Sequence, residues 1–177
     1  MKEKTYRTAL GGVLAALALT LLFLGSIFPF AEIAGPAIAS ACVAVIAEET
    51  SGSAGLSVYA AVSLLSLLVV PDKESAMLFV SFFGWFPLLK KYVDPRMRKV
   101  PAALLKLLLF NLSIITMYYI ALKVLFVPSL TEEFAEYSTA MYIVIMVLSN
   151  ITILLLDYSL DKVLFLYRHV WRKKLVR

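Results

Sequence analysis

Long apolar runs separated by short polar segments dominate this sequence. A helix that crosses a membrane needs about 20 mostly apolar residues. The runs that approach this length predict helices over Thr8–Phe28, Glu32–Ala47, Leu56–Val70, Ser75–Tyr92, Pro101–Phe126 and Ser138–Arg168. The pattern therefore predicts an all-α fold, a polytopic membrane protein with six transmembrane helices in one bundle. Residues 1–177 form a single membrane-embedded domain in this interpretation.

Prolines and glycines mark the predicted ends of the runs. Pro29 and Pro128 end the first and fifth runs, while Pro101 suits the first turn of a helix. Pro87 lies inside the fourth run and predicts a kink there, because proline removes a backbone hydrogen bond. The second run is short and rich in small residues, so its helix is either tilted or begins inside the bundle.

The composition supports a membrane location. Of the 177 residues, 62% are hydrophobic, whereas soluble domains have about 45–50%. The first apolar run is too long for the hydrophobic part of a signal peptide, so we expect a retained helix. The net charge of +5 arises from short basic segments between apolar runs, which is typical of membrane topology signals and argues against nucleic acid as a partner.

The basic residues predict an orientation. With the N-terminus inside the cell, 15 of the 17 Lys and Arg residues fall on the inner side and only Lys73 and Lys123 fall outside. The inner turn near Glu48 and Glu49 is the exception, because it has no basic residue. We therefore expect a protein of the cell (plasma) membrane that crosses it six times, with both termini on the cytoplasmic side. Five crossings, without the short second helix, would put the basic C-terminus outside. The inner residues are Lys2, Lys4, Arg7, Lys90, Lys91, Arg96, Arg98, Lys99, Lys106, Lys162, Arg168, Arg172, Lys173, Lys174 and Arg177.

Polar residues inside predicted spans are costly and are therefore functional candidates. Asn150, Asp157 and Asp161 share one face of the sixth helix, since their offsets are seven and eleven residues. Asn111 and Tyr118 share a face of the fifth helix. The two asparagines either join helices through hydrogen bonds or contact a substrate.

Lys106 is predicted to lie near Asp157 or Asp161. If the last two helices are antiparallel neighbours, the three residues reach similar depths near the inner boundary. A structural ion pair, or snorkelling of each side chain to water, explains them most simply. A proton or ion relay and contact with a cytoplasmic partner are the alternatives.

Aromatic residues gather in the fourth helix and in the outer half of the last two. Phe79 and Phe83, together with Tyr118 and Tyr142, could form stacking walls for a flat organic ligand. Lipid-facing or interfacial aromatics would give the same pattern.

Small residues are dense in the first helix. Gly11 with Ala15, and Gly12 with Ala16, are spaced so that a second helix can approach closely. The groove either packs within this bundle or docks onto a separate membrane subunit. We expect the face that holds Gly12 and Ala16 to be exposed to a partner.

The motifs of soluble enzymes are absent from the sequence. It has no phosphate-binding glycine loop, and one Cys and one His are too few for a metal site built from these residues. We therefore expect no enzyme activity, no metal and no cofactor. Any uphill transport would need energy from a partner or an ion gradient.

The layout and the first helix resemble one family. The segment Leu10-Gly11-Gly12-Val13-Leu14-Ala15-Ala16-Leu17 is similar to the alanine-spaced motif of S components, the substrate-binding subunits of energy-coupling factor transporters. Gly12 stands where the family usually has alanine. The resemblance implies that the small residues contact a transmembrane coupling subunit driven by two ATPase subunits, and that a vitamin-like micronutrient binds in the outer half. The substrate-binding candidates are Phe79, Phe83, Asn111, Tyr118, Tyr142 and Asn150.

A different class of function has a similar layout. The rod-shape-determining membrane protein D family consists of non-transporting scaffolds of the cell envelope with comparable size. A ligand-shaped cavity in the outer half would favour a substrate-binding subunit, and a fully packed outer half would favour the scaffold. A membrane-embedded enzyme is less favoured than either, because no pair of catalytic residues shares one depth and face.

Overall fold

The computed structural model describes residues 2–28, 31–123 and 138–171, and these residues are all-helical. The expected helix stops at Pro29 and Pro128, and the expected end at Phe126, lie outside this part of the chain. The elements are α1 (Lys2–Gly25), α2 (Ala34–Glu49), α3 (Gly52–Val69), α4 (Lys73–Leu78), the π-helix η1 (Phe79–Phe83), α5 (Phe86–Val93), α6 (Lys99–Lys123), α8 (Thr139–Leu166) and the π-helix η2 (Tyr167–Trp171).

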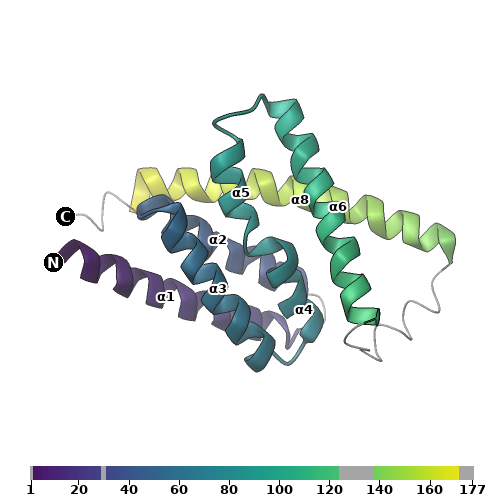
Figure 1. Cartoon of the computed structure of the whole chain (residues 1–177), viewed down its shortest axis with the longest axis horizontal. Helices are drawn as coiled ribbons and strands as arrows, with labels where there is room; N and C mark the ends of the chain where they lie inside the picture. The colour runs from purple at the N-terminus through teal and green to yellow at the C-terminus, as the bar shows by residue number, and fades with distance from the viewer. Residues whose placement is uncertain (1, 29–30, 124–137, 172–177) are drawn as a thin grey trace.

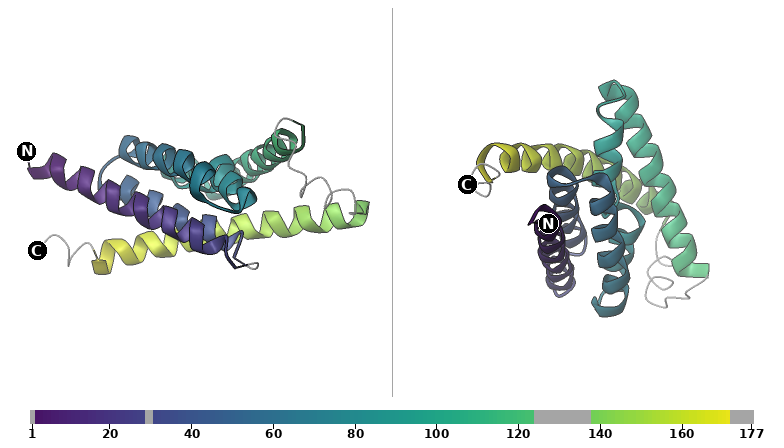
Figure 2. Two further views of the ribbon diagram at one scale, coloured as in Figure 1. Left: turned by 90° about the horizontal axis from the view of Figure 1, so that it is seen from below. Right: turned by 60° about the vertical axis from the view of Figure 1, so that its left-hand side comes forward.

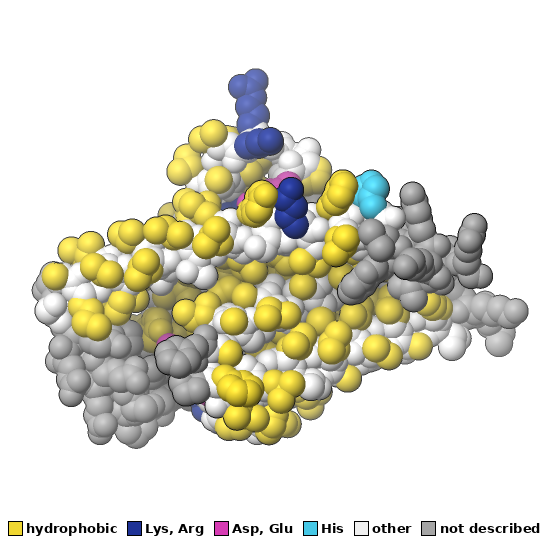
Figure 3. All heavy atoms as spheres, turned by 180° about the vertical axis from the view of Figure 1, so that it is seen from behind, with side chains coloured by type: hydrophobic (Ala, Val, Ile, Leu, Met, Phe, Trp, Pro, Cys, Tyr) yellow, Lys and Arg dark blue, Asp and Glu magenta, His cyan; other side chains and the backbone are white. Residues whose placement is uncertain are grey.

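Five helical stretches in the described ranges are long and apolar enough to cross a membrane. They correspond to α1, α3, the α4–η1–α5 segment, α6 and α8 with most of η2. Helix α2 has 16 residues and is about 24 Å long at 1.5 Å per residue. Much of the surface is hydrophobic, as the view from behind shows (Figure 3). These features are compatible with a multi-pass membrane protein.

Helix α2 lies at the centre of the molecule. It packs against α1, α3, η1, α5 and α8 (Figures 1 and 2). Its buried face is made mainly of small residues, such as Ala39, Val43 and Ala47. Small side chains let neighbouring helices approach closely, which increases the dispersion contacts between them. The small-residue composition that makes α2 a weak apolar run thus makes it suitable as the core helix.

The predicted kink in the fourth run is present, one turn before Pro87. A π-helical turn occupies η1, and the chain starts a new helix at Phe86 with Pro87 in its first turn. Proline has no N–H, and its ring clashes with the carbonyl four residues earlier. The α-helical pattern therefore cannot continue through the segment between Phe83 and Pro87.

Side chains satisfy the carbonyl groups at this break. Tyr59 Oη donates to the Val80 carbonyl at 2.7 Å, and Trp85 Nε1 donates to the Ser81 carbonyl at 2.6 Å. Gly84 allows the close contact with α3, because a Cβ there would lie 2.5 Å from the Tyr59 ring. An unpaired carbonyl in hydrocarbon costs several kcal/mol, so these two donors stabilise the broken helix.

Helices α6 and α8 cross at a steep angle instead of lying side by side as antiparallel neighbours (Figures 1 and 2). They meet near their crossing point and diverge on either side of it. Helix α8 runs past the compact group formed by α1, α2 and α3, and most of its apolar side chains are exposed.

Polar contacts join the helix ends in two layers. In one layer Arg168 Nε donates to Glu48 at 2.9 Å, and Lys91 donates to the Ala47 carbonyl. In the other layer Ser75 Oγ donates to the Glu32 carbonyl at 2.9 Å. The first layer contains Lys91 and Arg168, which the charge pattern predicts to lie on the cytoplasmic side, so we call it the inner layer and the second the outer layer.

The small residues of α1 lie on two different sides of the helix. Gly12 and Ala16 are exposed, and a Cβ on Gly12 would meet nothing within 4 Å. Gly11 faces Val58 of α3, and Ala15 is half-buried against the core. The Gly12–Ala16 face is therefore open in this chain, as expected. Whether a partner covers it stays a prediction.

The close approach of α1 and α2 generates a test of the packing. A Cβ at Gly25 would lie 2.8 Å from the Gly35 Cα and 3.2 Å from the Ala31 carbonyl oxygen. We expect Gly25→Ala to lower the free energy of unfolding by about 1–3 kcal/mol, because backbone must move. Gly12→Ala, the matched control, should raise it by about 0.5–1 kcal/mol through helix propensity. Unfolding curves in detergent measure both, and equal effects would contradict this packing.

Candidate functional site

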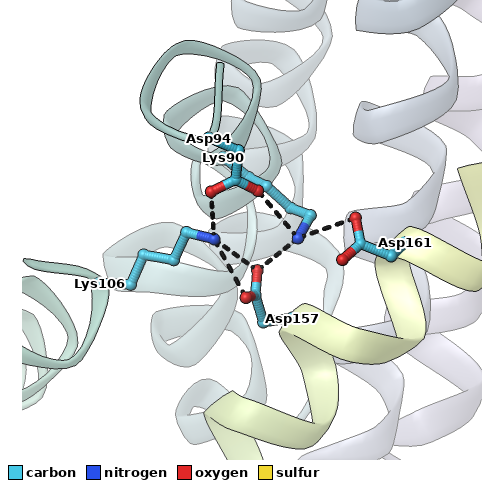
Figure 4. A network of polar contacts seen from close by, with 5 residues as sticks. All are labelled: Lys90, Asp94, Lys106, Asp157 and Asp161. Carbon is cyan, nitrogen blue, oxygen red and sulfur yellow. Dashed lines mark hydrogen bonds and ion pairs between the residues drawn. The ribbon is translucent and has the colours of Figure 1, made fainter. Parts of the chain in front are cut away.

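An ion-pair network in the inner layer joins three helices (Figure 4). Lys106 of α6 donates to the two carboxylate oxygens of Asp157 on α8 at 2.9 and 3.0 Å. The predicted proximity of Lys106 and Asp157 is confirmed. The Lys106 residue is only 5% exposed, so it does not snorkel to water in this structure.

Lys90 of α5 lies at the centre of the same network. Its ammonium contacts Asp157 at 2.6 Å, Asp161 at 3.0 Å and Asp94 at 3.1 Å. Lys106 also pairs with Asp94. The sequence reasoning missed Lys90 and Asp94, although their four-residue spacing on one helix face was a usable signal. The ion-pair network therefore consists of Lys90, Asp94, Lys106, Asp157 and Asp161.

The network contains two ammonium groups and three carboxylates. Burial raises the pKa of Asp94, but hydrogen bonds from Lys106 and Lys90 outweigh it and leave that pKa below its ordinary value of 3.8. A lowered folded-state pKa means that Asp94 stabilises the fold above pH 3.8 and loses this effect as the pH falls below it. At neutral pH the network holds the inner ends of α5, α6 and α8 together.

A cavity of about 330 Å³ adjoins the network in the inner layer. Lys90, Asp94 and Asp161 contribute to its wall, beside the Arg168–Glu48 pair. Tyr167 Oη also donates to Glu49 at 3.0 Å nearby. These contacts join α8 and η2 to the end of α2, so the cavity's polar groups serve mainly to hold helix ends together.

A larger cavity of about 690 Å³ lies between α6 and α8, and Glu32 of the outer layer lines part of it. Four of the six predicted substrate-binding residues line it: Phe83, Asn111, Tyr118 and Tyr142. Ligand cavities in proteins commonly measure about 300–1,000 Å³ and combine apolar walls with a few polar groups. This cavity has both the size and the composition of a small-molecule site.

Asn111 and Asn150 form a mutual hydrogen-bonded pair between α6 and α8. Asn111 Nδ2 donates to Asn150 Oδ1 at 2.8 Å, and Asn150 Nδ2 donates back at 3.1 Å. Each amide gives a second proton to its own helix, at the carbonyl groups of Leu107 and Met146, both at 2.8 Å. The pair joins the helices, and Asn111 also forms part of the cavity wall.

Two acidic residues that the sequence reasoning did not select also line the cavity. Glu74, in the first turn of α4, accepts a hydrogen bond from Tyr118 Oη at 2.6 Å. Glu32 lies just before α2, where its carbonyl accepts the hydrogen bond from Ser75. The hydropathy pattern placed Glu32 at the start of the second predicted helix and Glu74 just before the fourth, and it gave no sign that they would face the cavity.

Phe79 and Phe83 lie in different environments. Phe79 is fully buried, its ring centroid is 6.2 Å from that of Tyr59, and it is not among the residues that line the outer cavity. Phe83 belongs to an aromatic cluster around Phe82, which also contacts Phe86 and Phe110. These phenylalanines are buried and do not face lipid, and Phe83 and Phe110 carry the cluster to the cavity wall.

Comparisons with protein-family models, with curated proteins and with solved structures give no match to this chain. The site must therefore be interpreted from its own chemistry. In the described ranges, no group of three or more His, Cys, Asp or Glu side chains could hold a metal ion. The outer cavity offers apolar walls, aromatic rings and hydrogen-bonding groups, which are the features of a binding site for an organic molecule.

The central position of Asp157 in the ion-pair network can be tested against Asp161. Asp157 contacts both buried lysines, and its side chain is 24% exposed, whereas that of Asp161 is 63% exposed. We expect Asp157→Asn to lower the free energy of unfolding by about 3 kcal/mol, because two buried ammonium groups lose one of the two carboxylates that they share. Asp161→Asn should cost less than about 1 kcal/mol, as exposed pairs do. Unfolding curves in detergent with the same loss for both variants would contradict this arrangement.

Proposed function

We propose that this protein is the substrate-binding membrane subunit of a transporter, similar to an S component of an energy-coupling factor system. It captures a small organic, vitamin-like micronutrient for ATP-driven import by partner subunits. The observation that carries the proposal is the 690 Å³ cavity between α6 and α8. Four residues selected from the sequence as substrate contacts line it.

The outer cavity also favours this function over the alternative scaffold. A non-transporting scaffold needs no internal space, and its outer half would be expected to pack closely. Here aromatic side chains such as Phe83 and Phe110 surround an open space in the outer half, with Asn111 at its wall. Empty space between helices costs dispersion contacts, so its retention supports a ligand-binding role.

The proposal includes a topology and a partner. The protein crosses the cell membrane six times and has both termini in the cytoplasm, which fits the 15-to-2 division of basic residues. Helix α2, short and central, is then the second crossing. Because the sequence has no phosphate-binding loop, ATPase subunits and a transmembrane coupling subunit supply the energy. The exposed Gly12–Ala16 face of α1 is the proposed contact for the coupling subunit.

Ligand capture is tested by filling the cavity. Ser149 lies on the cavity wall in α8, and we expect Ser149→Trp to occupy the space of the ligand. The protein is purified from cells grown in rich medium and denatured, and the released small molecules are identified by mass spectrometry. A molecule bound at near-equal molar amounts to the native protein should fall by about tenfold or more in the variant, because the indole fills the cavity.

Val147→Trp is the matched control, since Val147 is exposed on the same helix and does not line the cavity. It should retain the bound molecule. If the native protein and the control release no more of any small molecule than Ser149→Trp does, the cavity is not a capture site. The proposed function then fails.

Coupling is tested on the open face of α1. A double variant with leucine at both Gly12 and Ala16 should hold a partner helix away, because close backbone approach needs small residues. We expect co-purification of the coupling subunit and uptake to be lost, with folding and ligand binding intact. Leucine at the exposed residues Ser57 and Ala140 is the control and should change neither. Misfolding or lost ligand binding in the Gly12–Ala16 variant would place this face inside the bundle.

A further inference from the structure

The hydrogen-bonding groups of the outer cavity have already used most of their protons. Tyr118 donates to Glu74, and Thr152 Oγ1 donates to the Leu148 carbonyl at 3.0 Å. Both amide protons of Asn111 are used, one by the Leu107 carbonyl and one by Asn150. What these three side chains still offer to a ligand is oxygen lone pairs. Ser149 and Tyr142 also have hydroxyl groups on this wall, and a hydroxyl can donate or accept a hydrogen bond.

The orientation of the asparagine pair is fixed by its surroundings. Asn111 Nδ2 faces the Leu107 carbonyl, and Asn150 Nδ2 faces the Met146 carbonyl. Turning either amide over would bring its oxygen against a carbonyl oxygen, which is repulsive. Asn111 Oδ1 accepts one bond from Asn150 and has a second lone pair, since an amide oxygen has two.

The charge of the cavity wall has one sign. Glu32 and Glu74 line the cavity, and no Lys, Arg or His is among the described residues that line it. Lys73, the neighbour of Glu74, turns away and donates to the carbonyl groups of Leu67 and Val70 at 3.1 and 2.9 Å. The wall therefore combines negative charge with hydrogen-bond acceptors. An anionic ligand would be repelled and would find few donors.

We propose that the outer cavity binds an organic cation that carries N–H donors on an apolar or aromatic body. Its charged nitrogen lies toward Glu74 and Glu32, whose carboxylates can accept charge-assisted hydrogen bonds. Its body lies against Phe83, Phe110 and the apolar side chains of α6 and α8. Aromatic faces such as these attract a cation in addition to burying apolar surface. The inference rests on the proposed function and specifies the class of its substrate.

The test uses three indole compounds that differ mainly in charge. Tryptamine is a cation with N–H donors, tryptophol is its neutral alcohol, and indole-3-acetate is an anion. Binding to the full-length protein in phosphatidylcholine nanodiscs is measured by equilibrium dialysis, and binding to empty nanodiscs is subtracted. We expect tryptamine to bind at least about tenfold more tightly than tryptophol, since a charge-assisted hydrogen bond contributes more than a neutral one. Indole-3-acetate should bind more weakly than either.

Charge-removing variants locate the effect. Glu74→Gln keeps an oxygen that can accept the hydrogen bond from Tyr118, and it removes the negative charge. It should therefore lower the affinity for tryptamine by about tenfold and change the affinity for tryptophol by less than about twofold. Glu49→Gln is the matched control, because Glu49 also accepts a hydrogen bond from a tyrosine, Tyr167, and lies outside the cavity. It should not change the affinity for either compound.

The possible failures are distinct. Equal or tighter binding of tryptophol or indole-3-acetate, or no loss of tryptamine binding in Glu74→Gln, overturns the preference for a cation. So does failure of tryptamine to bind the native protein. The proposed capture function still stands if the small molecule released from the native protein, and absent from Ser149→Trp, proves neutral or anionic. It fails separately if no such molecule exists.

Discussion

Every polar group placed between these helices must find its partner inside the protein, because hydrocarbon offers none. The structure meets this constraint in three ways. Tyr59 and Trp85 donate to carbonyl groups at the break in the α4–η1–α5 segment. Two lysines and three aspartates neutralise most of one another's charge in the inner layer. Two asparagines bind each other in the middle of the molecule. At each of these three places, a polar side chain inside or beside an apolar run joins or supports a helix.

This constraint also explains why the molecule has two unlike parts. Helices α1, α2 and α3 pack through small residues and form the compact part of the core. Helices α6 and α8 are joined to it through a few buried apolar side chains, such as Phe110 and Leu160, and through polar contacts at a few points. Between those points α6 and α8 diverge, and the outer cavity fills the space. A protein that binds ligands can keep such space only if other contacts hold its walls apart.

The sequence predicted the helices well, because hydropathy and helix-breaking residues act locally. It also predicted the Lys106–Asp157 contact, since helix periodicity and depth constrain both residues. It did not find Lys90 or Glu74, because their positions depend on how the broken α4–η1–α5 segment turns and on how α6 leans away from α8. Phe79 and Phe83 look alike in the sequence, yet one is in the core and the other lines the outer cavity. Only the three-dimensional packing separates them.

The π-helical turn at Phe79–Phe83 contains one more residue than the same turn of an α-helix. A residue inserted into a regular α-helix would rotate everything after it by about 100°, given 3.6 residues per turn. The wider π-helical turn absorbs such a residue, so α5 still directs Lys90 toward Asp157. An insertion or deletion at this turn that the chain did not absorb would point Lys90 away from Asp157, while the apolar character of the segment would hardly change. Among homologous chains, a one-residue gap at this turn would therefore alter the inner-layer contacts more than many substitutions do.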